Sequence, residues 1–508
     1  MKFRVVGLTI TFLLILSLGF LAVGSFSSKG ASPSGGGALG QVTTNEAVSN
    51  GTQPNVVIIL TDDQPKGLLS AMPTVQREIA DKGSTFTNAV IPTSLCCPSR
   101  TSLLTGLYSN QSGVWGNRPD SQGGYKVFKA RGNEERTLAV KLAGAGYVSG
   151  MFGKYLNGYE PTSGTPRPVG WNDFSVFFGS PEYYNFRYVT DSKPGINILD
   201  KPNTSISKFV SKKQYSTTYF GSRTVDFIKS VPKEKPLFAL FTPYAAHGPF
   251  TPEPKYRNAK FNSKKIFSDP SVNEKNVSDK PLWVQKQSKL NLSTERSTLL
   301  GQFQTLKSVD DQVKNILNAL AQTGRLDNTL LVFTSDNGYQ HGQHRLQAKN
   351  TPYRAATNVD LLVRYPQRIT ASKQNSIVSA NVDLSATVLE TVGLPNTTSG
   401  QPLQATTHLG IPIMGTAWRY GNAVRPTYCG WRTNDGVFAR YSTGEEELYD
   451  YQKDPFELNN VIDKKEYASM RAEYTTRATT ACFNLPENFG ESFSHPNKKP
   501  AKAPRSQE

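Results

Sequence analysis

Acidic and amide side chains follow two apolar segments of this 508-residue chain. The four side chains are Asp62 and Asp63, after segment 55–60, and Asp336 and Asn337, after segment 329–334. Neither segment alternates with polar residues, which is typical of strands covered on both faces of a parallel sheet. Carboxylate and amide oxygens are the ligands that hard cations such as Ca²⁺ and Mg²⁺ prefer. The pattern therefore predicts a metal site, and for each pair taken alone the alternative is capping of the following helix.

Three further apolar segments end close to residues that can bind or transform an anion. In chain order they are Cys96 and Arg100 after segment 85–91, Lys154 after segment 147–152, and His247 after segment 237–241. Ligands of open parallel sheets bind at the carboxyl ends of the strands. Five strand ends that carry such residues predict one common site.

Cys96 precedes a predicted helix that begins at Pro98, extends to about Thr105 and is terminated by Gly106. The free N–H groups and the dipole at the start of a helix favour an anion there. Two alternatives stay open for Cys96 on this evidence. It is a structural cysteine at a helix entry, or it is a reactive thiolate, because a helix N-terminus lowers the pKa of a thiol.

The elements that position these residues alternate along the chain. From residue 55 onward, short apolar runs alternate with helical segments, which indicates an α/β fold. One helix is marked by apolar residues at helical spacing and is expected to end at Gly324. These apolar residues are Val313, Ile316, Leu317 and Leu320. The Lys-, Asn- and Ser-rich stretch 252–292 predicts a surface insertion. We expect residues 54–405 to carry the site and residues 406–486 to form a smaller C-terminal subdomain.

The two ends of the chain differ from its body. Residues 1–24 combine Lys2 and Arg4 with a long apolar run and small residues at its end, which predicts a secretory signal, with an uncleaved anchor as the alternative. Residues 25–53 predict a flexible linker, and residues 487–508 predict a disordered basic tail. We therefore expect a secreted protein, or one tethered by its N-terminal segment.

The chain carries 57 Lys and Arg against 40 Asp and Glu, a net charge of +17. This excess favours an anionic partner, which can be nucleic acid, an acidic surface or an acidic polysaccharide. The lysines are scattered and no nucleic-acid-binding signature accompanies them, so nucleic acid is the least favoured partner.

The four cysteines fall into two groups. Cys96 and Cys97 are adjacent, a spacing that rarely supports a disulfide. Cys429 and Cys482 are predicted to pair, because disulfides persist in exported proteins. The alternative for this second group is two separately buried thiols.

Residues 96–106 carry a recognisable signature. Cys96-Cys97-Pro98-Ser99-Arg100, with the trailing Thr105-Gly106, resembles the type I sulfatase signature Cys-x-Pro-x-Arg. The resemblance extends from residue 55 to about residue 461 and includes segments 153–157, 247–250, 336–339, 448–450 and 454–458. Cys-Cys-Pro-Ser-Arg together with Gly-Lys-Tyr-Leu-Asn is most similar to the N-acetylglucosamine-6-sulfatases and related endosulfatases.

The resemblance implies an alkaline-phosphatase/sulfatase-like α/β fold, with a large mixed, mostly parallel sheet flanked by helices and a smaller C-terminal α+β subdomain. It also implies that a maturase oxidises Cys96 to formylglycine, whose hydrate attacks a sulfate ester. A divalent cation, Ca²⁺ or alternatively Mg²⁺, is expected to be held by Asp62, Asp63, Asp336, Asn337 and the side chain of residue 96.

The same resemblance implies roles for four basic residues. Arg100 is expected to hold the diol and the carboxylates in place, and Lys154 and Lys349 to contact the sulfate. His247 is expected to bind the ester or to protonate the leaving alcohol. A lone histidine after a strand is more often structural, but His-x-Pro in this position favours function.

Several positions depart from the family pattern. Leu156 stands where many sulfatases have a histidine, and Asn157 at the next position is expected to replace it in part as a substrate contact. His344 is a second candidate for an imidazole at the substrate. Arg354 stands where the family often has an acidic residue, and it either adds positive charge to the cleft or faces solvent.

The expected function is hydrolysis of sulfate esters, with sulfated sugars such as 6-O-sulfated glucosamine as the substrate class. One alternative is a phosphonate monoester or phosphodiester hydrolase on the same scaffold. The other is a non-catalytic protein that binds an anionic glycan.

Overall fold

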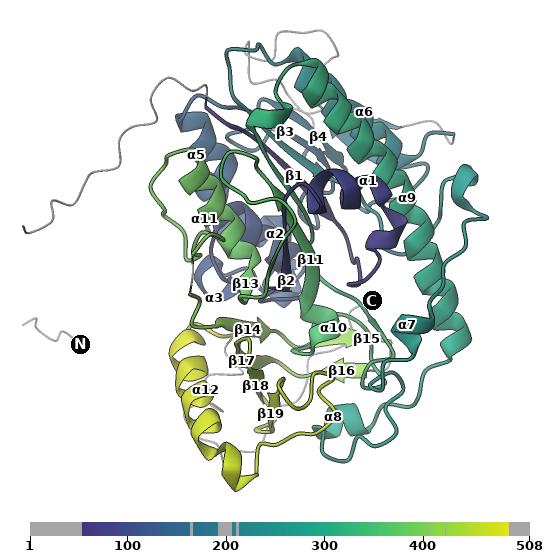
Figure 1. The fold of residues 1–508 in the computed structure, drawn as a ribbon, viewed down its shortest axis with the longest axis vertical. Coiled ribbons are helices and arrows are strands. Elements are labelled where there is room, and N and C mark those ends of the chain that lie inside the picture. Colours follow the sequence, from purple (N-terminus) through teal and green to yellow (C-terminus); the bar gives the residue numbers. More distant parts are fainter. Residues whose placement is uncertain are drawn as a thin grey trace, which may run out of the picture. The chain divides into compact units, whose positions relative to one another are not determined.

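A large mixed sheet runs through the computed structural model of the chain, which describes residues 53–162, 166–190, 206–209, 213–405, 407–421 and 423–486 (Figure 1). The sheet has eleven strands in the order β12-β2-β11-β8-β1-β7-β3-β4-β5-β6, with β13 paired to β2. These strands are β1 (Asn55–Thr61), β2 (Ser84–Val90), β3 (Val148–Gly153), β4 (Asp173–Phe177), β5 (Arg187–Thr190), β6 (Ile206–Phe209), β7 (Leu237–Thr242), β8 (Thr329–Ser335), β11 (Asn358–Arg364), β12 (Lys373–Asn375) and β13 (Ser379–Ala380). The predicted signal, nearly all of the predicted linker and the predicted basic tail lie outside the described residues.

The five strands that are followed by predicted site residues all run in one direction. β1 pairs in parallel with β7 and β8, and β3 pairs in parallel with β7. β11 is antiparallel to both β8 and β2, so β2 has the same direction as β1. The carboxyl ends of β1, β2, β3, β7 and β8 therefore meet at one edge, which confirms the predicted mixed, mostly parallel sheet.

Alternate residues of β1 enter two different hydrophobic cores. Val56, Ile58 and Leu60 belong to one core, and Val57 and Ile59 to the other. All five are buried, and each such aliphatic side chain contributes about 1.5–3 kcal/mol when it leaves water. This burial on both faces is the reason why the strand shows no polar alternation.

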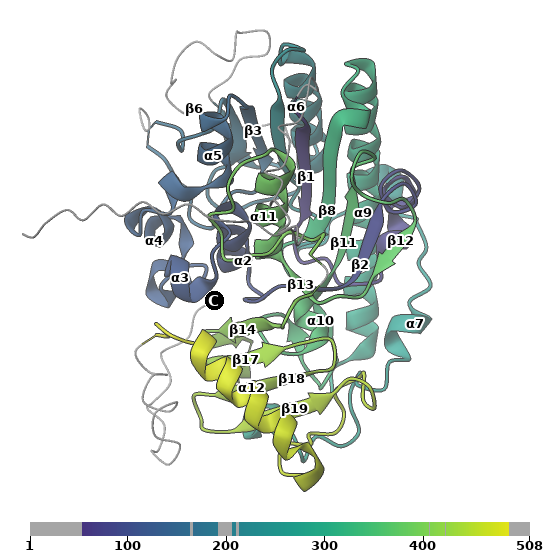
Figure 2. The same cartoon turned by 60° about the vertical axis from the view of Figure 1, so that its left-hand side comes forward.

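Helices cover both faces of the sheet (Figures 1 and 2). α2 (Cys96–Thr105), α5 (Leu138–Gly144) and α11 (Asn381–Thr391) pack into one core, and α6 (Ser216–Ser230) and α9 (Leu292–Gln322) pack together in the other. The shorter helices are α1 (Pro73–Val75), α3 (Ser109–Ser112), α4 (Gly124–Ala130), α7 (Lys264–Phe267), α8 (Leu282–Gln285) and α10 (Arg354–Thr357). The predicted apolar stripe of α9 is buried, and Gly324 follows the end of the helix with φ 70°. Among the described residues no helix has the length and apolar character needed to cross a membrane.

The C-terminal part forms a second, antiparallel sheet covered by one helix (Figure 2). Its strands are β14 (Ile411–Gly415), β17 (Tyr428–Arg432), β18 (Gly436–Tyr441) and β19 (Glu446–Asp450), and the helix is α12 (Ala468–Ala481). Two small hairpins accompany it, β9 (Gln340–His341) with β10 (Gln347–Ala348) and β15 (Trp418–Tyr420) with β16 (Ala423–Arg425). Arg432 in β17 is fully buried, donates to Asn358 Oδ1 of β11 at 2.8 Å and pairs with Glu457 Oε1 at 3.0 Å. The small and large sheets therefore share buried polar contacts.

The stretch 252–292 differs from the predicted surface insertion. Glu274, Lys280 and Val284 within it are buried. Lys280 Nζ donates to Leu458 O at 2.8 Å, and Val284 packs in the same apolar cluster as Tyr441. Its polar composition is explained by buried ion pairs and hydrogen bonds to the C-terminal part, in addition to solvent exposure.

Candidate active site

The ends of β1 and β8 bring the four predicted metal ligands together. Thr61 lies opposite Ser335 in the parallel register, so the residues that follow each strand are neighbours. Asn337 Nδ2 donates to Asp63 Oδ1 at 2.7 Å, and the Asp63 backbone N–H donates to Asp336 Oδ1 at 3.2 Å. Asp62, Asp63, Asp336 and Asn337 are all buried.

Asp63 is held by Gln302, which the sequence did not indicate and which His341 contacts in turn. Asp63 has a left-handed backbone with φ 57°, and its carbonyl accepts a hydrogen bond from Gln302 Nε2 of α9 at 3.2 Å. Gln302 Oε1 in turn lies 2.8 Å from His341 Nε2. The only signal in the sequence is a polar residue within the long helix 292–322, which by itself indicates no partner.

The helix that carries Cys96 begins earlier than predicted. α2 starts at Cys96 itself, so Pro98 is the third helical residue and not the first. Proline is tolerated there because the N–H groups of the first helical turn have no intrahelical acceptor. Gly106 ends the helix with φ 71°, as predicted. Cys96 thus lies in the first turn, where the helix dipole favours negative charge.

The thiol of Cys96 faces the carboxylates at the end of β1. Its Sγ lies 3.6 Å from Asp62 Oδ1 and 4.0 Å from Asp63 Oδ1. Arg100, one helical turn later, donates from Nε to Asp336 Oδ2 at 2.8 Å and lies 3.5 Å from Asp62 Oδ2. One guanidinium therefore connects the ends of β1 and β8.

Two buried lysines complete this cluster. Lys154 follows β3 and pairs with Asp62, while Lys349 follows β10 and pairs with Asp63. Lys349 Nζ also lies 2.8 Å from Cys96 Sγ. Gly153 before Lys154 has φ 121°, and a Cβ there would come within 2.0 Å of Thr242 O. Glycine is therefore required for the approach of β3 to β7 beside the lysine.

His247 is reached from β7 through a short loop. Its Nε2 lies 3.6 Å from Asp63 Oδ2, and its ring stacks on Tyr244 with centroids 4.8 Å apart. The side chain is 32% exposed, unlike the buried lysines. His247 is therefore the member of the cluster that solvent, and hence a bound ester, can reach from outside.

The charges of the cluster set the protonation of its members. Burial alone would raise the pKa of Asp62, but Lys154, His247 and Arg100 outweigh burial, and the pKa lies below its ordinary value. Lys349 and His247 lower the pKa of Asp63 in the same way against burial. Burial raises the pKa of the Cys96 thiol to about 12, against the effect of the two lysines. This raised pKa favours the neutral thiol over the thiolate alternative for unmodified Cys96.

The donor atoms fit a divalent cation. Ligand atoms of Asp62, Asp63, Cys96 and His247 all lie within 4.8 Å of one another. Asn337 Oδ1 is buried and has no hydrogen-bond donor among the described residues. Carboxylate and amide oxygens dominate the set, which suits a hard cation better than a transition metal.

Comparison with known proteins identifies the family. Residues 54–394 match the family described as Sulfatase, and residues 342–481 match the family described as N-sulphoglucosamine sulphohydrolase, C-terminal. The chain belongs to the sulfatase family. The predicted resemblance is therefore confirmed.

Two sulfatases illustrate the similarity in sequence. An extracellular sulfatase SULF-1 homolog of Drosophila melanogaster is 34% identical over 352 residues, which cover 68% of this chain and 30% of the relative. The N-acetylglucosamine-6-sulfatase of Homo sapiens is 31% identical over 370 residues, which cover 70% of this chain and 64% of the relative. The chain spans less than two thirds of the length of either relative.

Solved structures agree on the fold. A protein in complex with its substrate D-glucosamine-2-N,6-O-disulfate has a TM-score of 0.68 at 22% identity, covering 84% of this chain and 97% of that one. The phosphonate monoester hydrolase of Agrobacterium radiobacter has a TM-score of 0.59 at 21% identity, covering 84% and 95%. These similarities confirm the predicted alkaline-phosphatase/sulfatase-like fold class.

Two positions that depart from the sulfatase pattern contact residues outside the Cys96 cluster. His344 is buried, with Nδ1 2.7 Å from Glu274 Oε2 and Nε2 3.8 Å from Glu457 Oε2. These contacts hold the His344 ring between two carboxylates, and the expected substrate contact stays a prediction for this residue. Arg354 lies over the Tyr451 ring at 4.7 Å and donates from Nη1 to Pro455 O at 3.2 Å, so it does not simply face solvent.

Asn157 lies three residues after Lys154 and is half-buried. Its Oδ1 has no hydrogen-bond partner among the described residues. An amide oxygen without a donor partner can accept a hydrogen bond from a ligand hydroxyl. The expected substrate contact therefore stays a prediction for this residue.

Cys429 of β17 and Cys482 after α12 are joined in the structure by a disulfide with a Cα–Cα distance of 6.2 Å. Cys96 and Cys97 are free and buried. The disulfide attaches α12 to the small sheet. Both of its cysteines lie much later in the sequence than Cys96.

Proposed function

We propose that this protein hydrolyses sulfate esters of sugars, with 6-O-sulfated glucosamine units as the substrate class. The observation that carries the proposal is the position of Cys96 at the start of α2, with Sγ 3.6 Å from Asp62 Oδ1 and 2.8 Å from Lys349 Nζ. Family membership supports the reaction. Relatives named N-acetylglucosamine-6-sulfatase and the solved structure with a disulfated glucosamine support the sugar.

Residue 96 supplies the nucleophile after a maturase has oxidised Cys96 to formylglycine. In the hydrated aldehyde, one hydroxyl attacks sulfur while the bond from sulfur to the sugar oxygen breaks, which leaves residue 96 sulfated. The second hydroxyl then loses its proton, the carbonyl forms again and sulfate leaves. Water adds to the aldehyde to restore the hydrate. A serine can perform the first displacement but not this elimination.

The charged side chains around residue 96 hold the ester and the departing group. Lys154 and Lys349 bind sulfate oxygens and neutralise charge on the leaving oxygen. His247 protonates the leaving alcohol. Arg100 holds the carboxylates of Asp62 and Asp336 in position.

A divalent cation, Ca²⁺ in our assignment with Mg²⁺ as the alternative, would be held by Asp62, Asp63, Asp336, Asn337 and the side chain of residue 96. When bound, such a cation lowers the pKa of the attacking hydroxyl and neutralises sulfate oxygens. The buried Asn337 Oδ1, which lacks a donor among the described residues, supports this assignment.

Peptide mass spectrometry across residue 96 tests the proposal together with hydrolysis of p-nitrophenyl sulfate. We expect aldehyde or its hydrate at residue 96 of active protein and an unmodified thiol at Cys97. Cys96→Ala is expected to abolish turnover, whereas the matched variant Cys97→Ala retains it. Full activity of Cys96→Ala would overturn the mechanism.

The second candidate is a phosphonate monoester or phosphodiester hydrolase. It is supported by the fold similarity to the Agrobacterium enzyme. The kcat/KM for p-nitrophenyl sulfate, compared with those for p-nitrophenyl phenylphosphonate and a phosphodiester, separates the two. A non-catalytic glycan-binding protein is the remaining alternative. It would retain an intact Cys96 thiol and bind sulfated glycan without releasing sulfate.

We also infer that the protein is exported and that residues 54–405 and 406–486 are its two parts. Export is supported by the pattern of residues 1–24 and by relatives named extracellular sulfatases. Determination of the N-terminus of the mature protein in medium and membrane fractions distinguishes a cleaved signal from an anchor.

A further inference from the structure

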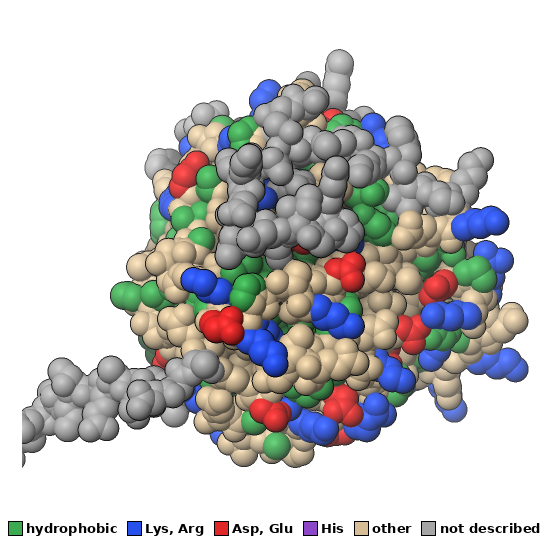
Figure 3. Space-filling model, turned by 90° about the horizontal axis from the view of Figure 1, so that it is seen from above, with side chains coloured by type: hydrophobic (Ala, Val, Ile, Leu, Met, Phe, Trp, Pro, Cys, Tyr) green, Lys and Arg blue, Asp and Glu red, His purple; other side chains and the backbone are tan. Residues whose placement is uncertain are grey.

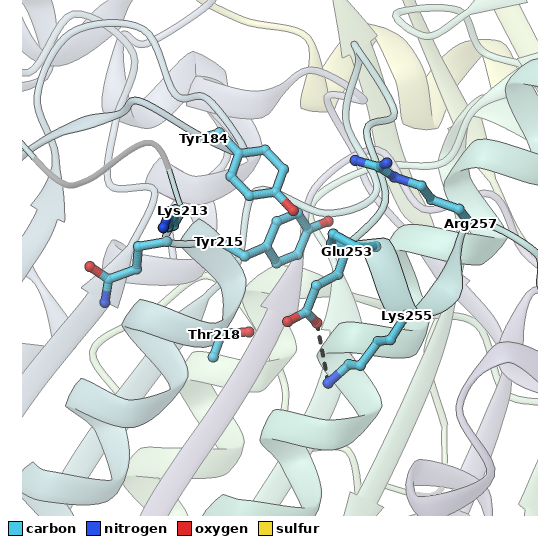
Figure 4. Close-up of a pocket in the computed structure, with 9 residues that line it drawn as sticks. Tyr184, Lys213, Tyr215, Thr218, Glu253, Lys255 and Arg257 are labelled. Atoms are coloured by element: carbon cyan, nitrogen blue, oxygen red, sulfur yellow. Dashed lines mark ion pairs between the residues drawn. The ribbon is translucent and has the colours of Figure 1, made fainter.

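A cavity of about 760 Å³ lies beyond the loop that carries His247. Its walls come from Tyr184 between β4 and β5, from residues 213–218 at the start of α6, and from residues 253–257 after β7. Figure 4 shows the rings of Tyr184 and Tyr215 at its centre, with Lys213 on one side and Arg257 on the other. Cavities of about 300–1,000 Å³ are typical of sites for small ligands.

A row of aromatic rings connects this cavity to His247. The ring of His247 stacks on Tyr244, which contacts Tyr183 at 5.2 Å between centroids. Tyr183 stacks on Tyr215 at 5.5 Å, and Tyr215 contacts Tyr184 at 5.2 Å. Tyr183 also donates from its hydroxyl to His247 O at 2.7 Å. The chain segment after β7 therefore borders both places, with His247 at the Cys96 site and residues 253–257 at the cavity.

Two hydroxyl groups on the cavity wall lack partners. The hydroxyl oxygens of Tyr184 and Thr218 are shielded from solvent and have no hydrogen-bond partner among the described residues. Shielded polar atoms normally find a partner, so a pair without one at a cavity indicates a ligand. Burial raises the pKa of Tyr184, so its hydroxyl is a donor at neutral pH. The two tyrosine rings add apolar faces beside these polar atoms.

The charge of the cavity wall favours an anion. Lys255 pairs with Glu253 at 3.3 Å and with Asp311 at 2.7 Å, so its charge is already compensated. Arg257 is exposed and forms no ion pair with any residue that the structure describes. Figure 3 shows described side chains of both signs interspersed over one face of the molecule. At the cavity, Arg257 supplies the positive charge that no described acidic residue pairs with.

We propose that this cavity is an accessory subsite for a second, anionic sugar unit of the same oligosaccharide whose sulfate ester occupies the Cys96 site. Arg257 pairs with a sulfate or carboxylate of that unit, the hydroxyls of Tyr184 and Thr218 bind its polar atoms, and the tyrosine rings contact its apolar face. The inference rests on the proposed function, because it names the neighbouring part of the same substrate. It implies a preference for chains of sulfated units over single ones.

Steady-state kinetics with two substrates test the subsite. One is 6-O-sulfated glucosamine, and the other is a tetrasaccharide that carries this unit next to sulfated and carboxylated sugars. The double variant Tyr184→Ala with Arg257→Ala is expected to raise the ratio of the KM for the tetrasaccharide to the KM for the monosaccharide about tenfold, because charge-assisted contacts are lost only with the longer substrate. Arg368→Ala is the matched control, because Arg368 is an exposed residue after β11. An unchanged ratio in the double variant overturns the subsite.

Direct binding distinguishes failure of the subsite from failure of the proposed function. Calorimetry measures the binding of the tetrasaccharide to the single variant Cys96→Ala and to the double variant Cys96→Ala with Arg257→Ala. This measurement does not depend on turnover. Weaker binding by the second protein supports the subsite even when wild-type protein hydrolyses no sulfate ester. Equal binding by both proteins overturns the subsite even when hydrolysis is confirmed.

Discussion

Lys349 Nζ lies 2.8 Å from Cys96 Sγ and also contacts the carboxylate of Asp63. One ammonium group therefore touches both the proposed nucleophile and a proposed metal ligand. Burial opposes its charge, but Asp63 together with the neighbouring Asp62 and Asp336 outweighs burial, and the pKa of Lys349 lies well above its ordinary value. Lys349 is thus a permanent positive charge at the point where the sulfate is expected to bind.

Removal of this charge should impair the reaction itself. We expect Lys349→Met to lower kcat/KM for aryl sulfates by about 100- to 1,000-fold, the usual cost of losing one group that stabilises developing negative charge. Lys373→Met is the control, because Lys373 is exposed on β12. Retention of more than half of the wild-type kcat/KM by Lys349→Met would contradict the role, provided that residue 96 is equally matured in both proteins.

Cation binding should stabilise the fold as well as support activity. Chelator treatment is expected to abolish hydrolysis, and readdition of Ca²⁺ or Mg²⁺ to restore it. Added cation should also raise the free energy of unfolding, by about 2.7 kcal/mol at a concentration of 100 times Kd. Asn337→Leu removes the amide oxygen at similar volume, so its stability should depend much less on cation. Equal stabilisation of this variant and of wild type would remove Asn337 from the ligand set.

His344 makes stability depend on pH. Burial lowers its pKa, but hydrogen bonds to Glu274 and Glu457 outweigh burial, so the pKa in the folded protein lies above the ordinary 6.5. Protonated His344 therefore stabilises the folded protein. This stabilisation is complete below about pH 6.5, the pKa of an unperturbed histidine, and is lost as the pH rises through the higher pKa of His344 in the folded protein. Wild type should therefore exceed His344→Gln in melting temperature by more at about pH 5.5 than at about pH 9.

The partner of His344 provides the control for this pH effect. In a Glu274→Gln background the effect of His344→Gln on melting temperature should depend less on pH, because the hydrogen bond to the carboxylate at 2.7 Å is gone. A melting-temperature difference that is constant with pH in the wild-type background would show that folding does not shift the pKa of His344, which would contradict the prediction.

The bridge between Cys429 and Cys482 closes a loop with a sequence separation of 53 residues. We expect neither cysteine to react with a thiol reagent in denatured, unreduced protein. Cys482→Ala should lower the free energy of unfolding by about 2–4 kcal/mol, because the unfolded chain gains freedom. Labelling of both cysteines without reduction would favour the alternative of two separate thiols.

Most residues of the cluster other than Lys349 are predictable, because they follow strands whose apolar runs are local in the sequence. That Asp62 and Asp336 lie close together follows from the rule that the carboxyl ends of parallel strands meet at one edge of the sheet. Gln302 is different, since its hydrogen bond to Asp63 O joins residues 239 positions apart and depends on how α9 packs. The burial of Lys280 is equally hard to predict, because the carbonyl of Leu458, which accepts its hydrogen bond, lies 178 positions later in the chain.

The first residue of α2 could be predicted only approximately from the sequence. Pro98 favours the first position of a helix, but every position of the first turn tolerates it, so the motif alone leaves the boundary uncertain by two residues. Lys349 was found only through the family motif, because it follows a two-residue strand without any hydrophobic pattern.

The buried guanidinium of Arg432 limits how this chain can be rearranged. It belongs to the small sheet, but Asn358 of the large sheet accepts one of its hydrogen bonds. A fragment that ended near residue 405 would lose that donor, and the complementary fragment would carry a buried charge with part of its partners missing, which is costly. A chimaera that takes its C-terminal part from a relative must therefore keep a matching donor in the small sheet and a matching acceptor in the large sheet. The two sheets therefore depend on each other for buried hydrogen bonds.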